Sequence, residues 1–546
     1  MTNSIAEIRD ADLLFVTGSN TTEAHPIIAM EMKRAVQNGA KLIVSDPRKI
    51  WMADIADIHM QLKPGTDVWL LNAMANVIVE EGLVDTEFIE KSTAGFEAVK
   101  QTVASYTPEK AEEVTGVPAE LIRESARMYA TTKKAGIYYT LGITEHTHGT
   151  DNVYCLANLV LMTGHLGVRS AGMNPLRGQN NVQGANDSGA SPIFYPGYQK
   201  VVDDEARLKF EEAWGVPLSP NEGQNLNVMM KSVIKGKMRG LYVMGEDIVI
   251  SEPNASKLEV GLNENCDFLV CQEIFHNVTT RFADVVLPGA CFAEKDGVFT
   301  NSDRRVQRVR KAVDPPGEAR EDWKILIEVA QKSGYPMPDY ASPAEVFKEM
   351  ASLTPKVAGI SHDRLERNIE GLQWPCPAPD HPGTPTLHMD GPLIGTAKFQ
   401  AVEYRPSDEL PDDEYPLVLS TGRILYHYNA ATQTRRESGP VAKQNRNFLE
   451  MNRKDARKSG FEDGEMIRVI SRRGTVEAEV MISPRMRQGC VWMPMHFAES
   501  RANLLTNDAG DPVTQTGEYK VCAVRVEGLN GHGNGNGSAN NGHSAH

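Results

Sequence analysis

The sequence lacks the paired cysteines that would spell out a metal centre. Its seven cysteines stand at positions 155, 266, 271, 291, 376, 490 and 522, and no two of them are spaced C-x-x-C. The sequence therefore contains no motif for a zinc site or for an iron–sulfur site. Scattered thiols in an odd number are typical of a reducing compartment, so we expect a cytoplasmic protein.

Three further absences narrow the class. No apolar run approaches the ~20 residues that a membrane span needs, so we expect none. A net charge of −15, with no lysine or arginine block, argues against nucleic acid as a partner. The G-x-G-x-x-G fingerprint is missing, which excludes an ordinary dinucleotide fold. At roughly 100–200 residues per domain, the chain has room for about three or four domains.

Near the start, two short apolar runs enclose a helical pattern. Residues 12–16 and 41–45 are typical of buried strands, and 26–37 of a helix that ends at Gly39. This is a βαβ unit with parallel strands, which binds ligands beyond the carboxyl ends of the strands. Residues 18–21 follow the first strand, where free amides favour an anion. After the second strand, Asp46 suits a ribose or base edge and Arg48 a phosphate; the alternative for this segment is a plain turn.

A similar pattern of buried strands that end in polar residues recurs further along the chain. Residues 240–244, 268–271 and 284–287 indicate strands, followed by acidic or amide groups such as Asp247 and Gln272, and 294–301 indicates a polar loop. Two halves of mononucleotide type imply two nucleotides, or one ligand with two nucleotide arms. Short strands and turns after residue 391 indicate a barrel. The Gly/Asn/Ser/His tail, 529–546, cannot pack a core and is predicted to be disordered.

A polar loop at 173–190 is dense in amides and glycines, and an apolar helix pattern at 152–162 precedes it. That helix should carry the loop to the interior, where its groups suit a cage around a polar ligand. Within the loop, Arg177 can hold a carboxylate or a phosphate by two parallel hydrogen bonds. The alternatives are a solvated loop and a surface salt bridge. His146 and His148 have no third partner in view, so we predict that they line or flank a pocket and assign no metal ligand.

The loop resembles a known family. The run Asn174-Pro175-Leu176-Arg177-Gly178-Gln179-Asn180-Asn181-Val182-Gln183-Gly184 is similar to the active-site loop of the catalytic subunit of molybdopterin-dependent formate dehydrogenases. The resemblance covers nearly the whole chain except the tail, and its other pieces are 18–26, 45–49, 244–247, 421–423 and 518–526. The loop is specific to formate dehydrogenases, whereas the other pieces are shared across the prokaryotic molybdopterin oxidoreductase superfamily.

The resemblance implies an α/β fold: two Rossmann-like parallel α/β domains plus a C-terminal six-stranded double-psi-type β-barrel. The corresponding divisions are 1–174, an α/β molybdopterin domain; 175–390, a second α/β domain for the guanine dinucleotide; and 391–528, the dinucleotide-binding barrel. It also implies a bis(molybdopterin guanine dinucleotide) cofactor, bis-MGD, that carries molybdenum or tungsten. The implied reaction oxidises formate to carbon dioxide, or runs in reverse, and passes two electrons to iron–sulfur or NAD-linked subunits.

Roles follow from the resemblance position by position. Arg177 matches the arginine that orients the substrate, and Gln179 matches a pterin contact. The positions that fall where the family touches the two dinucleotide arms are Gly18, Asn20, His25, Asp46, Arg48, Asp67, Gly245, Asp247, Gln272, Asp322, Thr421, Arg423, His427, Tyr428, Asn503, Tyr519 and Lys520. Two other classes stay open: another molybdopterin enzyme, such as a nitrate reductase-like protein, and a non-catalytic cofactor-binding subunit completed by a separate iron–sulfur chain. Arg177 within its amide loop argues against the first.

The resemblance has one large departure. Family members begin with a 4Fe-4S domain and a cysteine or selenocysteine, followed by histidine, that binds the metal, and none of this precedes Met1. A stretch like residues 1–5 follows that catalytic residue in the family, so we expect Met1 to lie inside a longer protein, which leaves an export signal open. The iron–sulfur cluster is then expected only in the missing part, and the chain alone should be inactive.

Our hypothesis is a reading frame that starts downstream of a selenocysteine codon taken as a stop; a real truncation or a split subunit is the alternative. We predict an in-frame TGA followed by a histidine codon upstream of the Met1 codon. Sequencing the DNA upstream tests this prediction, and unrelated sequence there would refute it.

Overall fold

The computed structural model describes residues 1–529, and the predicted tail lies outside them from residue 530 onward. The first unit is a parallel sheet with the strand order β3-β2-β1-β5-β6. Its strands are β1 (Leu13–Thr17), β2 (Lys41–Ser45), β3 (Ile58–Met60), β5 (Ala135–Tyr139) and β6 (Gly172–Pro175). All five residues of β1 are buried, as a parallel strand covered on both faces requires. The predicted βαβ unit is confirmed.

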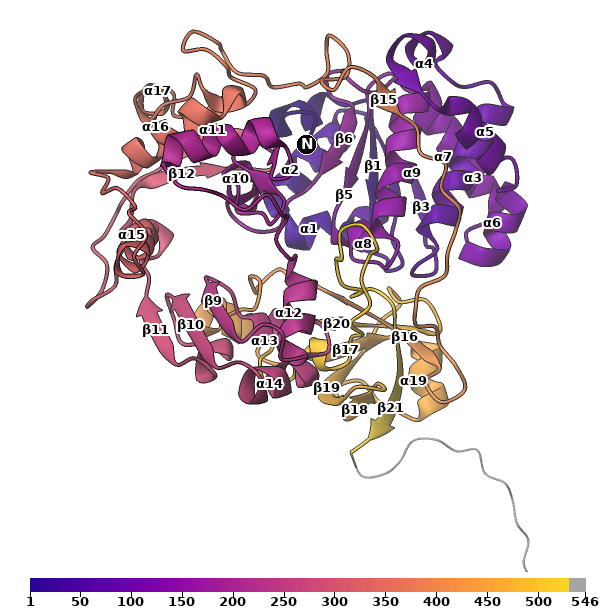
Figure 1. Ribbon diagram of the computed structural model, residues 1–546. Helices are drawn as coiled ribbons and strands as arrows, with labels where there is room; N and C mark the ends of the chain where they lie inside the picture. Colours follow the sequence, from indigo (N-terminus) through magenta and orange to yellow (C-terminus); the bar gives the residue numbers. More distant parts are fainter. Residues whose placement is uncertain (530–546) are drawn as a thin grey trace, which may run out of the picture.

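Helices cover both faces of this sheet (Figure 1). One face packs on a core with α2 (Pro26–Gln37), and the other on a core with α3 (Asp67–Glu80), α7 (Ala119–Thr131) and α9 (Gly149–Met162). The remaining elements are η1 (Ile5–Asp10), α1 (Thr21–Ala24), η2 (Trp51–Asp54), α4 (Thr86–Ser92), β4 (Thr93–Ala94), α5 (Phe96–Val103), α6 (Pro108–Thr115) and α8 (Leu141–Thr144). Residues 163–171 connect α9 to β6 and the polar loop, in which Asn174, Leu176, Gln183 and Asp187 are buried. The loop predicted to lie in the interior is therefore partly buried.

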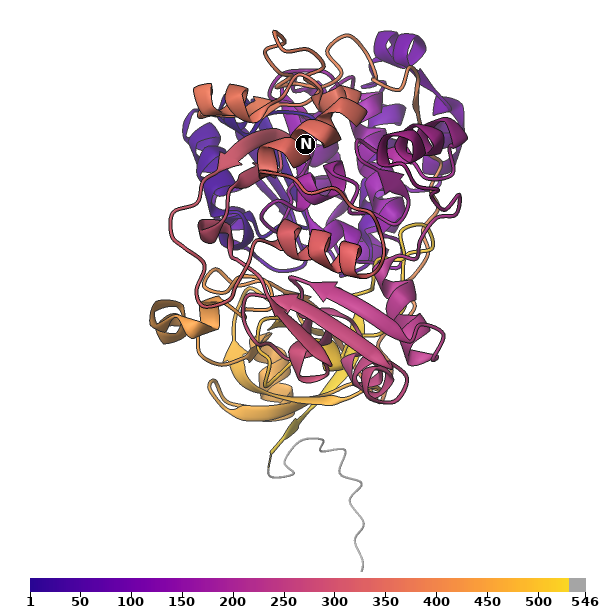
Figure 2. The ribbon, with the colours of Figure 1, turned by 60° about the vertical axis from the view of Figure 1, so that its left-hand side comes forward.

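A second, smaller parallel sheet stands in front of the barrel (Figure 2). Its order is β11-β10-β9, with β9 (Gly240–Met244), β10 (Phe268–Glu273) and β11 (Val285–Pro288). The elements around it are α10 (Val182–Asp187), β7 (Phe194–Tyr195), β8 (Gln199–Lys200), α11 (Asp204–Trp214), α12 (Leu226–Ile234), α13 (Ile248–Ser251), α14 (Ala255–Glu264), η3 (Thr279–Arg281), η4 (Phe292–Glu294), α15 (Asp322–Lys332), α16 (Pro343–Leu353), η5 (Pro355–Val357) and α17 (His362–Arg367).

The loop predicted at 294–301 is a correction. Residues Gly297–Thr300 form β12, which pairs antiparallel with β13 (Arg305–Val309), and β13 pairs with β14 (Leu372–Gln373). Four residues are too few for a period-two signal. The strand forms because β13 pairs with it from outside the segment, and β14 covers the other edge of β13.

The C-terminal unit is a closed barrel in the order β16-β20-β17-β19-β18-β21. Its strands are β16 (Leu417–Gly422), β17 (Phe448–Met451), β18 (Met466–Ile470), β19 (Thr475–Ile482), β20 (Cys490–Pro494) and β21 (Cys522–Gly528), with η6 (Thr434–Arg436), α18 (Ser438–Lys443), α19 (Arg453–Ser459) and η7 (Ala502–Leu504) between them. Closure leaves no exposed sheet edge. The predicted fold class is confirmed; the predicted divisions at 174/175 and 390/391 stay predictions.

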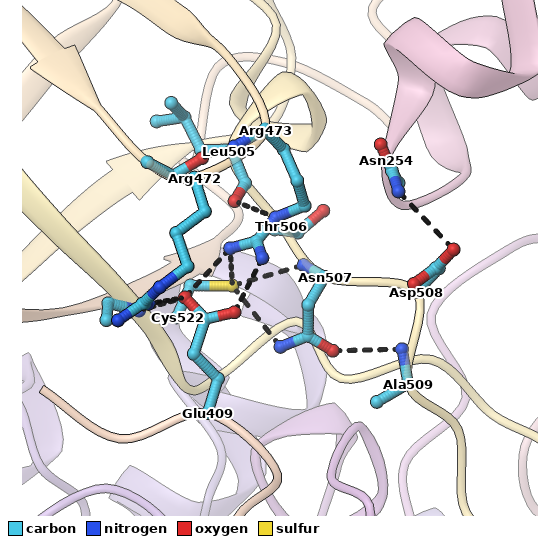
Figure 3. A network of polar contacts seen from close by, with 12 residues as sticks. Asn254, Glu409, Arg472, Arg473, Leu505, Thr506, Asn507, Asp508, Ala509 and Cys522 are labelled. Atoms are coloured by element: carbon cyan, nitrogen blue, oxygen red, sulfur yellow. Dashed lines mark hydrogen bonds and ion pairs between the residues drawn. The ribbon is translucent and has the colours of Figure 1, made fainter.

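A long connector joins the second unit to the barrel. Its short strand β15 (Ala397–Lys398) pairs with β4 of the first unit, and Phe399 and Val402 lie in the first unit's core. Glu409 then reaches the barrel, where Arg473 donates to it from both terminal nitrogens, at 2.6 and 2.9 Å (Figure 3). Arg472 and the Ala523 amide donate to the same carboxylate at 3.0 and 2.9 Å. The connector therefore ties the first unit to the barrel. Within residues 1–529, no helix combines the length and apolarity of a membrane span.

The contacts of Glu409 with Arg472, Arg473 and the Ala523 amide, which we call the Glu409 clamp, can be tested by mutation. The carboxylate is 11% exposed and Arg473 is 13% exposed, so Glu409→Ala leaves a mostly buried cation without its partner. We expect the free energy of unfolding to fall by about 3 kcal/mol. The control is Glu414→Ala, which breaks the Arg525 pair at a carboxylate that is 69% exposed; such a pair contributes about 0–1 kcal/mol. Urea unfolding followed by tryptophan fluorescence measures both variants, and equal effects would contradict the clamp.

Candidate functional site

A deep cleft lies where the carboxyl ends of β1, β2 and β5 face the barrel strands β16 and β20. The space in it that protein atoms leave unfilled is about 1050 Å³, part of it open to solvent. The predicted residues that line it are Gly18, Asn20, His25, Asp46, Arg48, Asp67, Thr421, Arg423 and Lys520. Residues from both ends of the chain thus meet in one place.

Several polar atoms in the cleft are buried without any partner among residues 1–529. They are both side-chain polar atoms of Asn20, Nδ1 of His25 and Nε of Arg423. Each unmade hydrogen bond costs about 1–3 kcal/mol, so this set favours a polar ligand that supplies the missing partners. Gly178 adds a cradle, because a Cβ there would lie 2.1 Å from the Arg423 guanidinium. A larger residue at this position would displace the Arg423 guanidinium from the polar loop.

Two buried carboxyl groups stand in the cleft. Burial raises the pKa of Asp46 and that of Asp67, each to about 6. Asp46 accepts a hydrogen bond from the Arg48 amide at 2.9 Å, as in a turn, and it also lines the cleft. The segment is therefore both a turn and part of the cleft. Asp67 is the first residue of α3. Both groups therefore lose their protons about two pH units above an ordinary aspartate, and hydrogen-bond donors on a ligand would favour their charged form.

Two cations in the cleft already have protein partners. Arg48 donates from Nε to Glu450 at 2.6 Å and lies 4.2 Å above the Trp492 ring. It therefore joins the first unit to the barrel, whatever contact it makes with a phosphate. Lys520 donates to the Thr421 carbonyl at 3.0 Å and pairs with Glu145 at 2.7 Å. Neither contact was evident from the sequence.

The prediction that His146 lines a pocket is confirmed. Its Nδ1 lies 3.2 Å from Glu518, and its Nε2 bonds the Gly142 carbonyl at 3.0 Å. Burial lowers the pKa of His146, but Glu518 and then Asp67 raise it, and the net pKa is above the ordinary value. His148 stacks on His146 at 5.2 Å, and burial with that neighbour lowers the pKa of His148 to about 4. Within residues 1–529, no three His, Cys, Asp or Glu side chains group as a metal site.

The polar loop lies at the edge of this cleft. Leu176 and Gly178 line the cleft, and His25 donates from Nε2 to the Arg177 carbonyl at 2.7 Å. The Arg177 amide donates to Ser302 Oγ at 3.2 Å, and Arg177 Nε donates to Gln183 Oε1 at 3.2 Å. Arg177 forms no ion pair with a described residue, so the surface salt bridge is wrong. Leu176, Gln183 and Asp187 are buried while Asn180 and Ser188 are exposed, so the loop is partly solvated.

A neighbouring cavity continues along the loop toward the barrel. Gln179, Arg423, His427 and Tyr428 line it. The Tyr428 hydroxyl accepts from the Asn180 amide at 2.9 Å, and Gln179 donates to Asn429 Oδ1 at 3.4 Å. His427 is held by the Gln444 carbonyl at 2.7 Å from its Nε2. The loop and the 424–429 segment of the barrel unit thus form one continuous wall.

The predicted residues of the second arm lie apart from the first cleft, at the ends of β9 and β10. Gln272 donates to Asp322 at 2.7 Å, and Gly245 makes the turn after β9 with a φ of +65°. Asp247 lines a separate cavity between this sheet and the barrel, but its carboxylate already accepts from the amides of Val278 and Thr279, at 3.1 and 3.0 Å. The structure therefore separates two groups of predicted residues, each at the carboxyl end of a parallel sheet.

Two predicted residues have mainly structural partners. Asn503 donates to the carbonyls of Ile250 and Ser251, both at 2.8 Å, which joins the barrel unit to the second sheet. The backbone carbonyl of Tyr519 accepts from the Thr421 amide at 3.2 Å, and Tyr519 lies before β21, which begins at Cys522. Neither residue lines the cavities described above.

Comparison with known proteins identifies the family. Residues 1–332 match the molybdopterin oxidoreductase family, and residues 417–523 match the molybdopterin dinucleotide binding domain. The chain belongs to the molybdopterin oxidoreductase family. These matches assign it a molybdopterin-type cofactor, and the predicted resemblance is confirmed.

Two proteins named as formate dehydrogenases are similar to this chain over most of its length. The alpha subunit of F420-dependent formate dehydrogenase 2 from Methanococcus maripaludis is 47% identical over 96% of this chain and 78% of its own length. Formate dehydrogenase H from Escherichia coli is 40% identical over 96% of this chain and 74% of its own. The solved structure of acetylene hydratase from Pelobacter acetylenicus has a TM-score of 0.74 at 19% identity, covering 96% of this chain and 81% of that one. It shows that the fold is shared.

Sequence reasoning missed several residues of this oxidoreductase's site. Glu145 lines the cleft, and its place shortly after the buried apolar run that forms β5 was a signal for it. Trp492 and Met495 also line the cleft but carried no signal, because nothing local in a barrel strand says which residues face another unit. Gln183 and Asp187 lie within the loop, but their positions next to Arg177 depend on how α10 folds back.

Asp67 predicts a pH dependence for the cofactor-free chain. Because burial raises its folded pKa to about 6, above the ordinary 3.8, its contribution to stability is present below pH 4 and is lost as the pH rises through 6. Asp67→Asn should therefore raise the thermal unfolding midpoint at pH 8 relative to the wild type, and the gain should shrink toward pH 4.

The control has the opposite sign. Burial raises the pKa of Asp57, but Lys41 and the Leu42 amide outweigh burial and hold it below its ordinary value. Asp57→Asn should therefore lower the midpoint at pH 8. A matching loss at pH 8 in both variants would contradict the raised pKa of Asp67.

Proposed function

We propose that this oxidoreductase is the catalytic subunit of a formate dehydrogenase. It oxidises formate to carbon dioxide, or runs the reverse reaction, on bis-MGD carrying molybdenum or tungsten, and its electrons pass to an iron–sulfur chain. The support is the set of relatives named as formate dehydrogenases, 47% and 40% identical to this chain. The observation that carries the proposal is Arg177, which is held at the edge of the cofactor cleft without a carboxylate partner among the described residues.

The residues present fit the proposed cofactor. In the first cleft, Asn20, His25 and Arg423 have buried polar atoms that lack partners, and they would hold one dinucleotide arm. Gly245, Gln272 and Asp322, at the ends of the second sheet, would hold the other arm, as parallel sheets commonly do. When bound, the cofactor supplies the metal that takes up two electrons from the substrate.

Arg177 binds and orients the substrate. A guanidinium matches a carboxylate with two parallel hydrogen bonds, so it fixes both oxygens of formate and leaves the C–H bond pointing away from the cation. Leu176 and Gly178, the chain neighbours of Arg177, line the cofactor cleft, so we place the bound formate beside that cleft. Orientation of this kind lowers the barrier without any covalent chemistry by the protein. His25, which holds the Arg177 carbonyl, keeps the loop in place while the substrate binds.

The alternative of a nitrate reductase-like enzyme makes a different demand on this site. Nitrate carries a charge similar to that of formate but has no C–H bond to orient. The two activities can be compared in the complete enzyme. We expect formate-dependent reduction of an artificial acceptor and no nitrate reduction.

The substitution Arg177→Lys tests whether the Arg177 guanidinium binds formate. Lysine keeps the charge but loses the bidentate geometry, so we expect kcat/KM for formate to fall by about 10–100-fold, equivalent to about 1.5–3 kcal/mol for hydrogen bonds to a charged group. Arg9→Lys serves as the control, because Arg9 is 47% exposed and pairs with Glu31 on α2. Steady-state kinetics of the complete enzyme measure the effect. An unchanged kcat/KM would show that Arg177 does not bind or orient formate.

We also expect no formate oxidation from the 546-residue polypeptide alone. The resemblance assigns the metal's cysteine or selenocysteine ligand and the 4Fe-4S cluster to a segment outside these residues. The chain is purified, reconstituted with cofactor and assayed with formate and an artificial acceptor. Cofactor retention without turnover is the expected result, and robust turnover would refute the assignment.

A further inference from the structure

The Arg177 side chain is backed by a line of buried polar groups. Its Nε donates to Gln183 Oε1 at 3.2 Å, and Gln183 is 4% exposed. Neither terminal nitrogen of Arg177 has an acceptor among residues 1–529. The protein therefore holds the guanidinium by its Nε edge and leaves the two terminal groups for a ligand.

Asp187 decides which end of the Gln183 amide faces Arg177. The amide nitrogen of Gln183 donates to Asp187 Oδ1 at 2.8 Å and to the Tyr198 hydroxyl at 2.9 Å. A carboxylate can only accept, so the amide nitrogen must face Asp187 and the carbonyl must face the guanidinium. If the amide turned over, it would present N–H groups to a cation.

Asp187 is itself held by two further donors. The Tyr198 hydroxyl donates to Oδ1 at 2.8 Å, and Trp374 Nε1 donates to Oδ2 at 2.6 Å. Tyr198 has a φ of +64°, a left-handed conformation that costs free energy for a residue with a Cβ. Such strain persists only where the surroundings over-determine it, and here it delivers the hydroxyl to the carboxylate.

We propose that Gln183 is a positioning residue for Arg177, and that Asp187, fixed by Trp374 and Tyr198, sets the orientation of the Gln183 amide. The inference rests on the proposed function, because the ligand of Arg177 is taken to be formate. It assigns a role to residues outside the cleft, none of which touches the substrate.

Asp187→Asn tests the orientation. Trp374 still donates, so the new amide turns its oxygen toward Trp374 and its nitrogen toward Gln183. Gln183 then turns over and meets Arg177 with N–H groups. We expect the KM for formate to rise about tenfold, equivalent to about 1.4 kcal/mol. The Kd of carbon-13-labelled formate, measured by NMR line width on the cofactor-loaded enzyme without an electron acceptor, should rise by the same factor.

A second substitution should rescue the first. With Trp374→Phe, the donor at Oδ2 is gone, and the asparagine introduced at position 187 can again offer its oxygen to Gln183. The Asp187→Asn, Trp374→Phe double variant should return to within about threefold of Trp374→Phe alone. A role limited to packing predicts instead that the double variant is worse than either single variant. Gln183→Met, which keeps the length but removes the amide, should raise KM about tenfold and make Asp187→Asn without further effect.

The outcomes separate the two proposals. An unchanged KM and Kd for formate in either Asp187→Asn or Gln183→Met overturns the positioning role, and Gln183→Met decides the matter if Asp187→Asn does not fold. A double variant without rescue overturns the orientation by Asp187. A complete wild-type enzyme that neither binds nor oxidises formate overturns the proposed function instead.

Discussion

The buried ion pair between Arg48 and Glu450 joins the first sheet to the barrel, and the cofactor cleft exists because these two units face one another. The pair is 2.6 Å long, and its side chains are 8% and 1% exposed. A buried pair adds little net stability, since desolvation offsets its attraction, but breaking it leaves a buried charge. Its value is geometric. It allows one relative position of strand ends and barrel, and Trp492 beneath the guanidinium narrows that position further.

Other polar contacts between the two units share this task. Glu518 accepts from the Thr147 amide at 3.0 Å, and Asp511 accepts from the Thr150 amide at 3.0 Å. Glu145 with Lys520 closes the cleft on the same side. The interface thus consists largely of charged and polar groups that must all be matched, which specifies one arrangement where a purely apolar interface would tolerate several.

The polar loop depends on a second buried cation. Arg304 is 2% exposed and donates to the carbonyls of Met1, Thr384 and Pro385 at 2.8–2.9 Å. Burial lowers the pKa of Arg304 to about 10, but it remains charged at neutral pH. The N-terminal segment that it holds pairs with the strand before the loop, where the Thr2 amide donates to the Met173 carbonyl at 3.0 Å. Segments that are far apart in the sequence therefore meet behind Arg177.

Elements whose local hydrophobic period is clear were predicted correctly from the sequence, whereas features that depend on tertiary contacts were not. The bounds of α2 and β2 match the prediction because burial on one or both faces fixes the hydrophobic period within a few residues. The strand at Gly297–Thr300 was missed because four residues carry no clear period and its pairing depends on β13, which lies outside the segment. The resemblance placed Asn503 and Asp247 with the cofactor, but in the structure their side chains hydrogen-bond backbone groups and threonine hydroxyls of the protein. A motif matches residue types, and it does not say which of their atoms are already satisfied.

By itself, the sequence determined the fold class, the position of the Arg177 loop after a buried helix and strand, and the family. Each of these follows from short-range patterns: apolar period, turn residues at strand ends, and a run of residues in fixed order. Only the tertiary structure decided that Asn20, His25 and Arg423 share one cleft, and that Gln183 and Asp187 stand behind Arg177. Those relations depend on how the sheet, the helix and the barrel pack. Packing is settled by long-range burial and by the matching of buried polar groups, which no local stretch of sequence records.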